Sequence, residues 1–80
     1  HTNLGIAYEA LKRWDKAIEA YKKAIQYSPA TPPPYIRLGR LYNSLNRKDE
    51  ALRVLKQVLG MVKEGPDAEE ARRLLKEVEK

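Results

Sequence analysis

The sequence contains no cysteine and a single histidine, which is the first residue. Without cysteine the chain can form neither a disulfide scaffold nor a thiolate metal site. With its one imidazole at position 1, the chain also lacks an interior histidine, the usual acid–base group and metal ligand. The acidic residues show no convergence in the sequence. We therefore expect no enzymatic activity, no metal site and no cofactor.

Long apolar runs are also missing, since no stretch approaches the roughly 20 residues of a membrane-spanning helix. No secretory signal pattern is present, but a sequence that starts within the repeat pattern cannot be read for targeting, so the localisation is unknown, with the cytoplasm as the default. The length of 80 residues allows one small domain, spanning residues 1–80. A content of 42% hydrophobic and 34% charged residues favours a folded helical domain over a disordered segment.

Acidic residues are too few to balance the basic ones. The net charge is +5, and residues 35–66 hold seven basic and three acidic residues. This excess permits weak association with nucleic acid or another polyanion. The basic residues are mixed with acids, and no aromatic residues alternate with them to stack on bases. Nucleic-acid binding through this middle segment is therefore the alternative function, not the preferred one.

The chain repeats itself with a period of 34 residues. Residues 4–29 and 38–63 share eight identities in 26 positions. The identical pairs are Leu4 with Leu38, Gly5 with Gly39, Tyr8 with Tyr42, Leu11 with Leu45, Arg13 with Arg47, Asp15 with Asp49, Ala17 with Ala51 and Lys22 with Lys56. A fixed period of this size is typical of stacked repeat proteins.

Within each copy, apolar residues recur at three- and four-residue steps, which predicts two amphipathic helices. Short polar segments at Lys12-Arg13 and Asn46-Arg47-Lys48 separate the two helices. Each copy is therefore predicted to form an antiparallel helix–turn–helix hairpin. A further apolar face in residues 67–79 predicts a fifth helix, which would cap the array.

Glycine inside a helix costs about 1 kcal/mol relative to alanine. Gly5 and Gly39 fall inside the predicted helices, so we expect another helix backbone to approach closely there. Ala17 and Ala51 are expected on the facing helices.

Proline and glycine also mark the predicted boundaries. Pro29 ends the second helix, because proline disfavours helical geometry in the residue before it. Residues 32–34 are three prolines, which the first turn of a helix tolerates; a ligand for a proline-binding domain is the alternative. Gly65-Pro66 forms the next boundary.

Leu4-Gly5-x-x-Tyr8, Ala17-x-x-x-Tyr21 and Pro29 resemble the tetratricopeptide repeat signature. The second copy matches it with Tyr35, Leu38-Gly39, Tyr42, Ala51 and Leu55, and the 34-residue period is the family's own. The resemblance implies an all-α fold, an α-solenoid of antiparallel helix–turn–helix repeats. It places repeat 1 at about 1–31, N-terminally truncated, repeat 2 at about 32–65 and a capping helix at about 67–79.

Two positions depart from the family pattern. Lys63 stands at the place of the closing proline, so the last helix of the second copy is expected to run longer. His1 stands where the family often has an aromatic residue, so the chain looks cut from a longer array. The uncovered first hairpin is therefore expected to make the chain self-associate, as a homo-oligomer, or leave it marginally stable.

The resemblance implies a non-catalytic scaffold or adaptor that binds a protein or peptide in a concave groove lined by the first helix of each hairpin. The expected peptide-binding residues are Asn3, Ile6, Arg37, Arg40, Asn43, Arg72 and Lys76. Arg72 and Lys76 follow from aligning Leu74-Leu75-x-x-Val78 with the Leu-Gly-x-x-Tyr motif.

Arginines in such a groove suit an acidic peptide, because their guanidinium groups bind carboxylates with two hydrogen bonds. Asn3 and Arg37 also match two positions of family members that hold the acidic tails of chaperones, whereas Pro33 stands where those carry lysine. The alternatives are that the arginines are merely solvated, or that the chain is a structural fragment with no ligand of its own.

Overall fold

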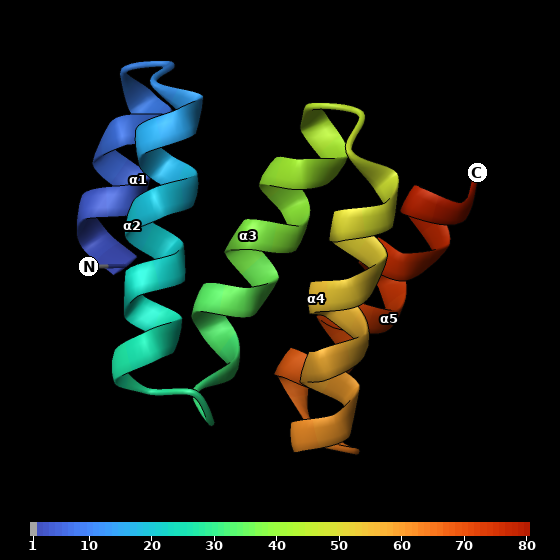
Figure 1. The fold of residues 1–80 in the computed structure, drawn as a ribbon. Helices are drawn as coiled ribbons and strands as arrows, with labels where there is room; N and C mark the ends of the chain where they lie inside the picture. The colour runs from blue at the N-terminus through green and yellow to red at the C-terminus, as the bar shows by residue number, and fades with distance from the viewer. Residues whose placement is uncertain (1) are drawn as a thin grey trace.

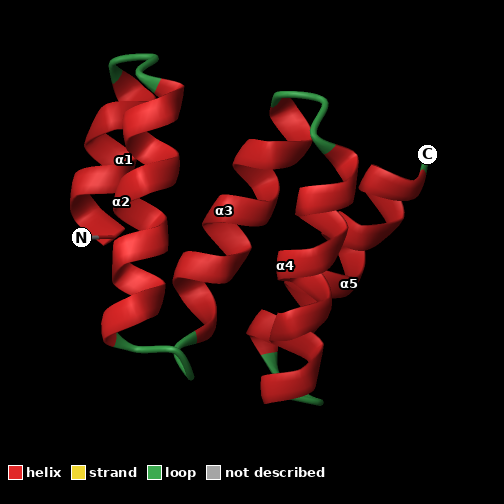
Figure 2. Ribbon diagram, in the orientation of Figure 1, coloured by secondary structure: helices red, strands yellow, loops and turns green. Residues whose placement is uncertain are grey.

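The computed structural model describes residues 2–80, so the prediction made for His1 lies outside the described residues. These residues form five α-helices and no strand: α1 (Thr2–Ala10), α2 (Trp14–Tyr27), α3 (Pro32–Ser44), α4 (Lys48–Met61) and α5 (Pro66–Glu79). Consecutive helices run in opposite directions and are joined by short loops (Figure 1, Figure 2). The predicted all-α repeat architecture is confirmed.

Each helix packs mainly on its neighbours in the chain. α3 and α4 form the most extensively packed pair, α1–α2 and α4–α5 are packed equally, and α2 joins the first hairpin to the second by packing on α3. α5 packs on both α4 and α3. None of the helices described in residues 2–80 combines the length and the apolar character that a membrane-spanning segment needs.

The two hairpin turns are built in the same way. The amide of Arg13 donates to the carbonyl of Tyr8 at 2.9 Å, and the amide of Arg47 donates to the carbonyl of Tyr42 at 2.8 Å. The same two carbonyl groups also accept the amides of Leu11 and Leu45 at 3.1 Å, so each turn closes on one shared acceptor. The repeat seen in the sequence is therefore a repeat of backbone structure.

Proline and glycine set the remaining boundaries as predicted. The loop that contains Pro29 follows α2. The carbonyl of Pro29 accepts a hydrogen bond from the Tyr35 hydroxyl at 2.8 Å. α3 begins within the three prolines, and α5 begins at Pro66 after Gly65, whose φ of 101° suits a glycine. The expectation that α4 runs longer without a closing proline is wrong. It ends at Met61, 34 residues after the end of α2.

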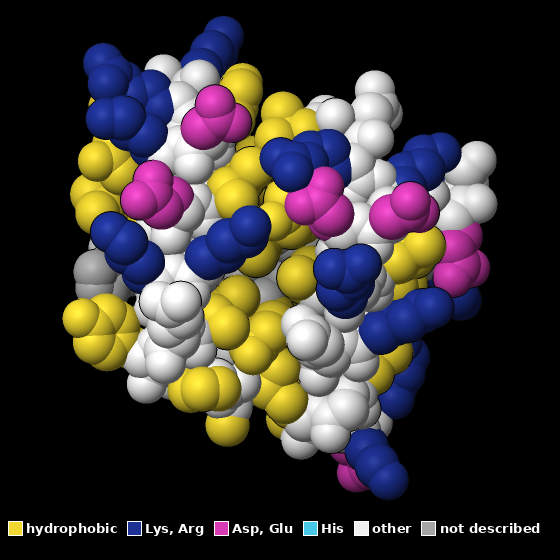
Figure 3. All heavy atoms as spheres, in the orientation of Figure 1, with side chains coloured by type: hydrophobic (Ala, Val, Ile, Leu, Met, Phe, Trp, Pro, Cys, Tyr) yellow, Lys and Arg dark blue, Asp and Glu magenta, His cyan; other side chains and the backbone are white. Residues whose placement is uncertain are grey.

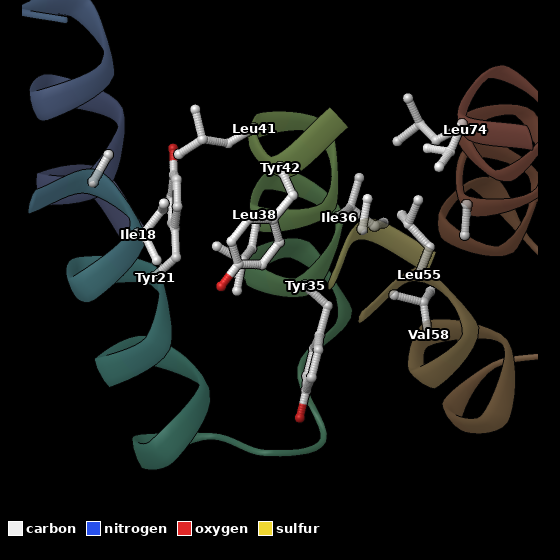
Figure 4. Close-up of a cluster of buried hydrophobic side chains, with 14 residues drawn as sticks. Ile18, Tyr21, Tyr35, Ile36, Leu38, Leu41, Tyr42, Leu55, Val58 and Leu74 are labelled. Carbon is white, nitrogen blue, oxygen red and sulfur yellow. The ribbon is translucent and has the colours of Figure 1, made fainter. Parts of the chain in front are cut away.

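The core runs through the stack between the hairpins and α5. Its largest fully buried side chains are Tyr21, Leu38, Leu55, Val58 and Val78. Leu38 and Tyr42 lie on the side of α3 that faces α2, while Leu55 and Val58 lie toward α5 (Figure 4). α3 is thus covered on both sides by apolar contacts.

Gly5 and Gly39 receive side chains, not a neighbouring backbone. A Cβ built on Gly5 would lie 2.5 Å from the Tyr21 ring, and one on Gly39 would lie 2.7 Å from the Leu55 side chain. The expected approach of another helix backbone is therefore wrong, because the atoms nearest to the two glycines belong to the side chains of Tyr21 and Leu55 and not to Ala17 or Ala51. In each hairpin one large side chain fills the space above the glycine.

Candidate interaction surface

The first helix of each hairpin and α5 lie on one side of the molecule. We call this side the α1/α3/α5 face and define it by Glu9, Arg37, Arg40, Asp67 and Glu70. It is hollowed between α3 and α5, where a hollow of about 120 Å³ is lined by Pro33, Ile36, Arg37, Arg40, Asp67 and Glu70. Two arginines of α3 therefore face two acids of α5 across a small depression.

Arg40 forms an ion pair with Glu70. Its Nη2 atom donates to the Oε1 atom of the carboxylate, and both side chains remain partly exposed. Exposed ion pairs of this kind stabilise a protein by about 0 to 1 kcal/mol. The pair joins α3 to α5 but is weak enough for another carboxylate to replace Glu70.

Arg37 lies one helical turn before Arg40 and belongs to a second polar cluster. The buried Tyr21 hydroxyl of α2 donates a hydrogen bond to the Glu9 carboxylate of α1. Burial raises the pKa of Tyr21 far above its ordinary value of 10.0, and the hydrogen bond and negative charge of Glu9 raise it further. The charge of Arg37 and its hydrogen bond act in the opposite direction on this pKa. Residues from three helices thus meet at one neutral phenol.

The structure places five of the seven expected binding residues on α1 and α3. Asn3 and Ile6 are exposed on α1, Arg40 is exposed on α3, and Arg37 and Asn43 are half-buried on α3. Arg37 and Arg40 line the same hollow. The structure therefore brings the two α3 arginines together.

Arg72 and Lys76 lie on another side of α5. Arg72 donates to the carbonyl of Lys63, beyond the end of α4, at 2.6 Å. Residues 70 and 72 point in directions about 200° apart on a helix, so Arg72 cannot share the Glu70 side. Lys76 is one turn further along the Arg72 side. The expected wall of four basic residues is therefore not formed, because α5 turns acids toward α3.

Sequence reasoning missed Asp67 and Glu70. The signal was available, because acids three residues apart on one helix face complement arginines spaced three apart on another. The motif alignment concealed it, since α5 has no Leu-Gly-x-x-Tyr sequence of its own.

In residues 2–80 no group of three or more acidic or histidine side chains is placed to hold a metal ion. A family model described as tetratricopeptide repeat matches residues 8–76. No curated protein matches the chain. Repeats of this family generally mediate protein–protein interaction and act as non-catalytic scaffolds.

Proposed function

The chain belongs to the tetratricopeptide repeat family, and from this premise we propose that its α1/α3/α5 face binds an acidic peptide segment of a protein partner. In this proposal the chain is an adaptor without catalytic activity. Its role is to hold one protein segment in a defined place.

The observation that carries the proposal is the position of Arg37 and Arg40. They lie three residues apart on α3, on the same side of the helix, and line one hollow with the apolar Ile36 and Pro33. A guanidinium group can donate two parallel hydrogen bonds to a carboxylate. Arg37 is half-buried, so less of its side-chain freedom remains to be lost on binding.

Glu70 gives the face a built-in competitor for the peptide. Its carboxylate already occupies the Arg40 guanidinium. A peptide carboxylate that replaces it exchanges one ion pair for another, so the net gain at Arg40 is small. Arg37 is therefore expected to contribute more to peptide affinity than Arg40.

The test uses a phage-displayed library of random dodecapeptides with free C-termini, selected on the whole chain. Enriched peptides are synthesised, and their affinities are measured by fluorescence anisotropy. We expect acidic peptides that lose about 10- to 100-fold in affinity with Arg37→Ala, the range of a charged hydrogen bond worth 1.5–3 kcal/mol. Arg53→Ala is the matched control, because Arg53 is an exposed arginine of α4 outside the hollow.

Two outcomes would contradict the proposal. Selection without enrichment of acidic residues would remove the role of the arginines. Equal losses with Arg37→Ala and Arg53→Ala would indicate attraction to overall charge. A single-stranded 20-nucleotide DNA serves as the second probe. Tighter binding of this DNA, with strong salt dependence, would favour the nucleic-acid alternative.

A further inference from the structure

The α1/α3/α5 face sorts its charges by helix. Glu9 lies on α1, Arg37 and Arg40 lie on α3, and Asp67 and Glu70 lie on α5. On the side formed by α2 and α4, by contrast, basic and acidic side chains are mixed around an apolar centre (Figure 3), and each of these two helices carries both signs. The face thus holds three acidic and two basic residues, a net charge of −1, although the whole chain carries +5. Overall positive charge therefore does not determine which segment this face binds.

Asp67 is the acid of this face whose charge has no partner in residues 2–80. The Glu9 carboxylate accepts the hydroxyl of Tyr21, and the Glu70 carboxylate pairs with Arg40. The half-buried Asp67 side chain forms neither a hydrogen bond nor an ion pair within the described part of the chain. It lies in the first turn of α5, where the helix dipole favours a negative charge. A carboxylate without a cation therefore stands at the start of a packed helix.

Asp67 and Arg37 line the same hollow, together with Ile36 and Pro33. Its volume of about 120 Å³ is the space of about four water molecules. A peptide carboxylate that binds Arg37 in so small a space lies close to the Asp67 carboxylate, and the protein screens the repulsion between them less than open water does. A second acidic residue of the peptide adds to this repulsion, whereas a basic residue compensates it.

We propose that Asp67 selects partner segments in which a lysine or arginine lies two residues from the acid that binds Arg37. The inference rests on the function proposed above and names its ligand more closely, as a segment of alternating charge and not a uniformly acidic one. Residues two apart in an extended segment point to the same side and lie about 6.6 Å apart. The axes of packed helices such as α3 and α5 are about 8–10 Å apart, and charged side chains that reach into the hollow between them fit this spacing. Repulsion of like charge gives the face its specificity.

A purely structural role of Asp67 predicts a different result. An acid in the first turn stabilises α5 through the helix dipole whatever ligand is present. Its removal would then change the stability of the chain, but all peptides would keep their relative affinities. The ratio of two peptide affinities in one protein therefore separates selection from stabilisation.

The probes are six short peptides, acetylated and amidated so that their ends carry no charge. Three have the sequence Gly-Ser-Leu-Glu-Ala-X-Leu-Ser-Gly, where X is lysine, glutamine or glutamate, and three have X two residues before the glutamate. Affinities for the whole chain are measured from amide chemical shifts, which also show that each variant is folded. In one of the two orders we expect lysine to bind about two- to fivefold more tightly than glutamine, and glutamine to exceed glutamate by a similar factor, the range of a surface ion pair.

Asp67→Asn is expected to remove this ranking, because asparagine keeps the shape of the side chain without its charge. Glu69→Gln is the matched control and is expected to preserve the ranking, since Glu69 is an exposed acid of α5 outside the hollow. Arg37→Ala is expected to weaken every peptide by about 10- to 100-fold, the range of a charged hydrogen bond.

The outcomes distinguish this inference from the proposed function. Equal affinities of the lysine and glutamate peptides in the wild type, or tighter binding of glutamate, would overturn the inference alone if Arg37→Ala still weakens them. So would a ranking that Asp67→Asn and Glu69→Gln change equally, because it would reflect overall charge. No binding at millimolar peptide, or affinities that Arg37→Ala leaves unchanged, would contradict the proposed function and the inference with it.

Discussion

Lys12 and Asn46 lie 34 residues apart and adopt the same left-handed backbone conformation, with φ of 60° and 61°. Each residue is in the turn that reverses the chain within its hairpin. Left-handed geometry costs an ordinary residue about 1–2 kcal/mol, and asparagine adopts it more readily than lysine. The first turn therefore has the less suitable residue of the two.

Lys12→Gly is expected to raise the free energy of unfolding by about 0.5–1 kcal/mol, because glycine adopts this conformation without a steric penalty. Asn46→Gly is expected to give a smaller gain. Urea denaturation of both variants measures the difference. Lys16→Gly, inside α2, is the control and is expected to lose about 1 kcal/mol. A loss of stability with Lys12→Gly would show that the left-handed conformation of Lys12 carries no steric cost in this turn.

Gly39→Ala and Gly60→Ala are expected to change stability in opposite directions. The added Cβ at Gly39 would lie 2.7 Å from Leu55, whereas a Cβ at Gly60 meets nothing within 4 Å. Crowding of this kind costs about 1–3 kcal/mol, while alanine in an open helical position gains up to about 1 kcal/mol over glycine. Thermal denaturation monitored by circular dichroism measures both. Equal gains in the two variants would mean that Leu55 moves aside without cost.

Tyr21 is expected to make the fold sensitive to alkaline pH. The pKa of its phenol is raised in the folded protein above the ordinary value of 10.0. The folded state therefore holds this proton more tightly, and the stability it contributes is complete below pH 10 and falls as the pH rises. The expected loss is about 1.4 kcal/mol per pH unit above 10.

The measurement for Tyr21 is the urea midpoint from pH 8 to pH 11 for the wild type and Tyr21→Phe. The phenylalanine variant keeps the ring over Gly5 but has no proton to lose. Its stability is therefore expected to fall less steeply above pH 10. Parallel curves for the two proteins would contradict the assignment.

Glu70→Gln is expected to strengthen the binding of acidic peptides that use Arg40 by about two- to fivefold. The substitution removes the carboxylate that pairs with this arginine. The free energy of that pair lies in the range of an exposed ion pair. Fluorescence anisotropy with one selected peptide measures the change. Glu69→Gln, on a neighbouring exposed position of α5, is the matched control and is expected to have less effect. An unchanged affinity in Glu70→Gln would place the peptide away from Arg40.

The repeat period made most of the backbone predictable from the sequence. Identities such as Tyr8 with Tyr42 fixed the register of the two hairpins, and Pro29 and Gly65-Pro66 marked where they end. The sequence predicts a longer α4, because Lys63 replaces the closing proline. Val62 has extended geometry and ends α4 without it.

The candidate surface was less predictable, because it depends on how α5 is rotated about its axis. Buried positions on α5 are Ala68, Ala71, Leu74 and Val78, a spacing that several registers of the repeat motif can match. Only contact with α3 shows that Glu70, and not Arg72, faces Arg40. The spacing of residues within one helix thus predicts which of them share a face. It does not predict which residues of two helices distant in the sequence contact each other.

The packing of each helix on its neighbours in the chain also bears on how fast the molecule folds. Nearly all contacts between helices join elements adjacent in sequence, and the contact of α3 with α5 spans a single intervening helix. Chains with such local contacts lose little loop entropy before their contacts form, and they fold rapidly. α3 touches α2, α4 and α5, so we expect it to belong to the folding nucleus, with α1 joining the structure last.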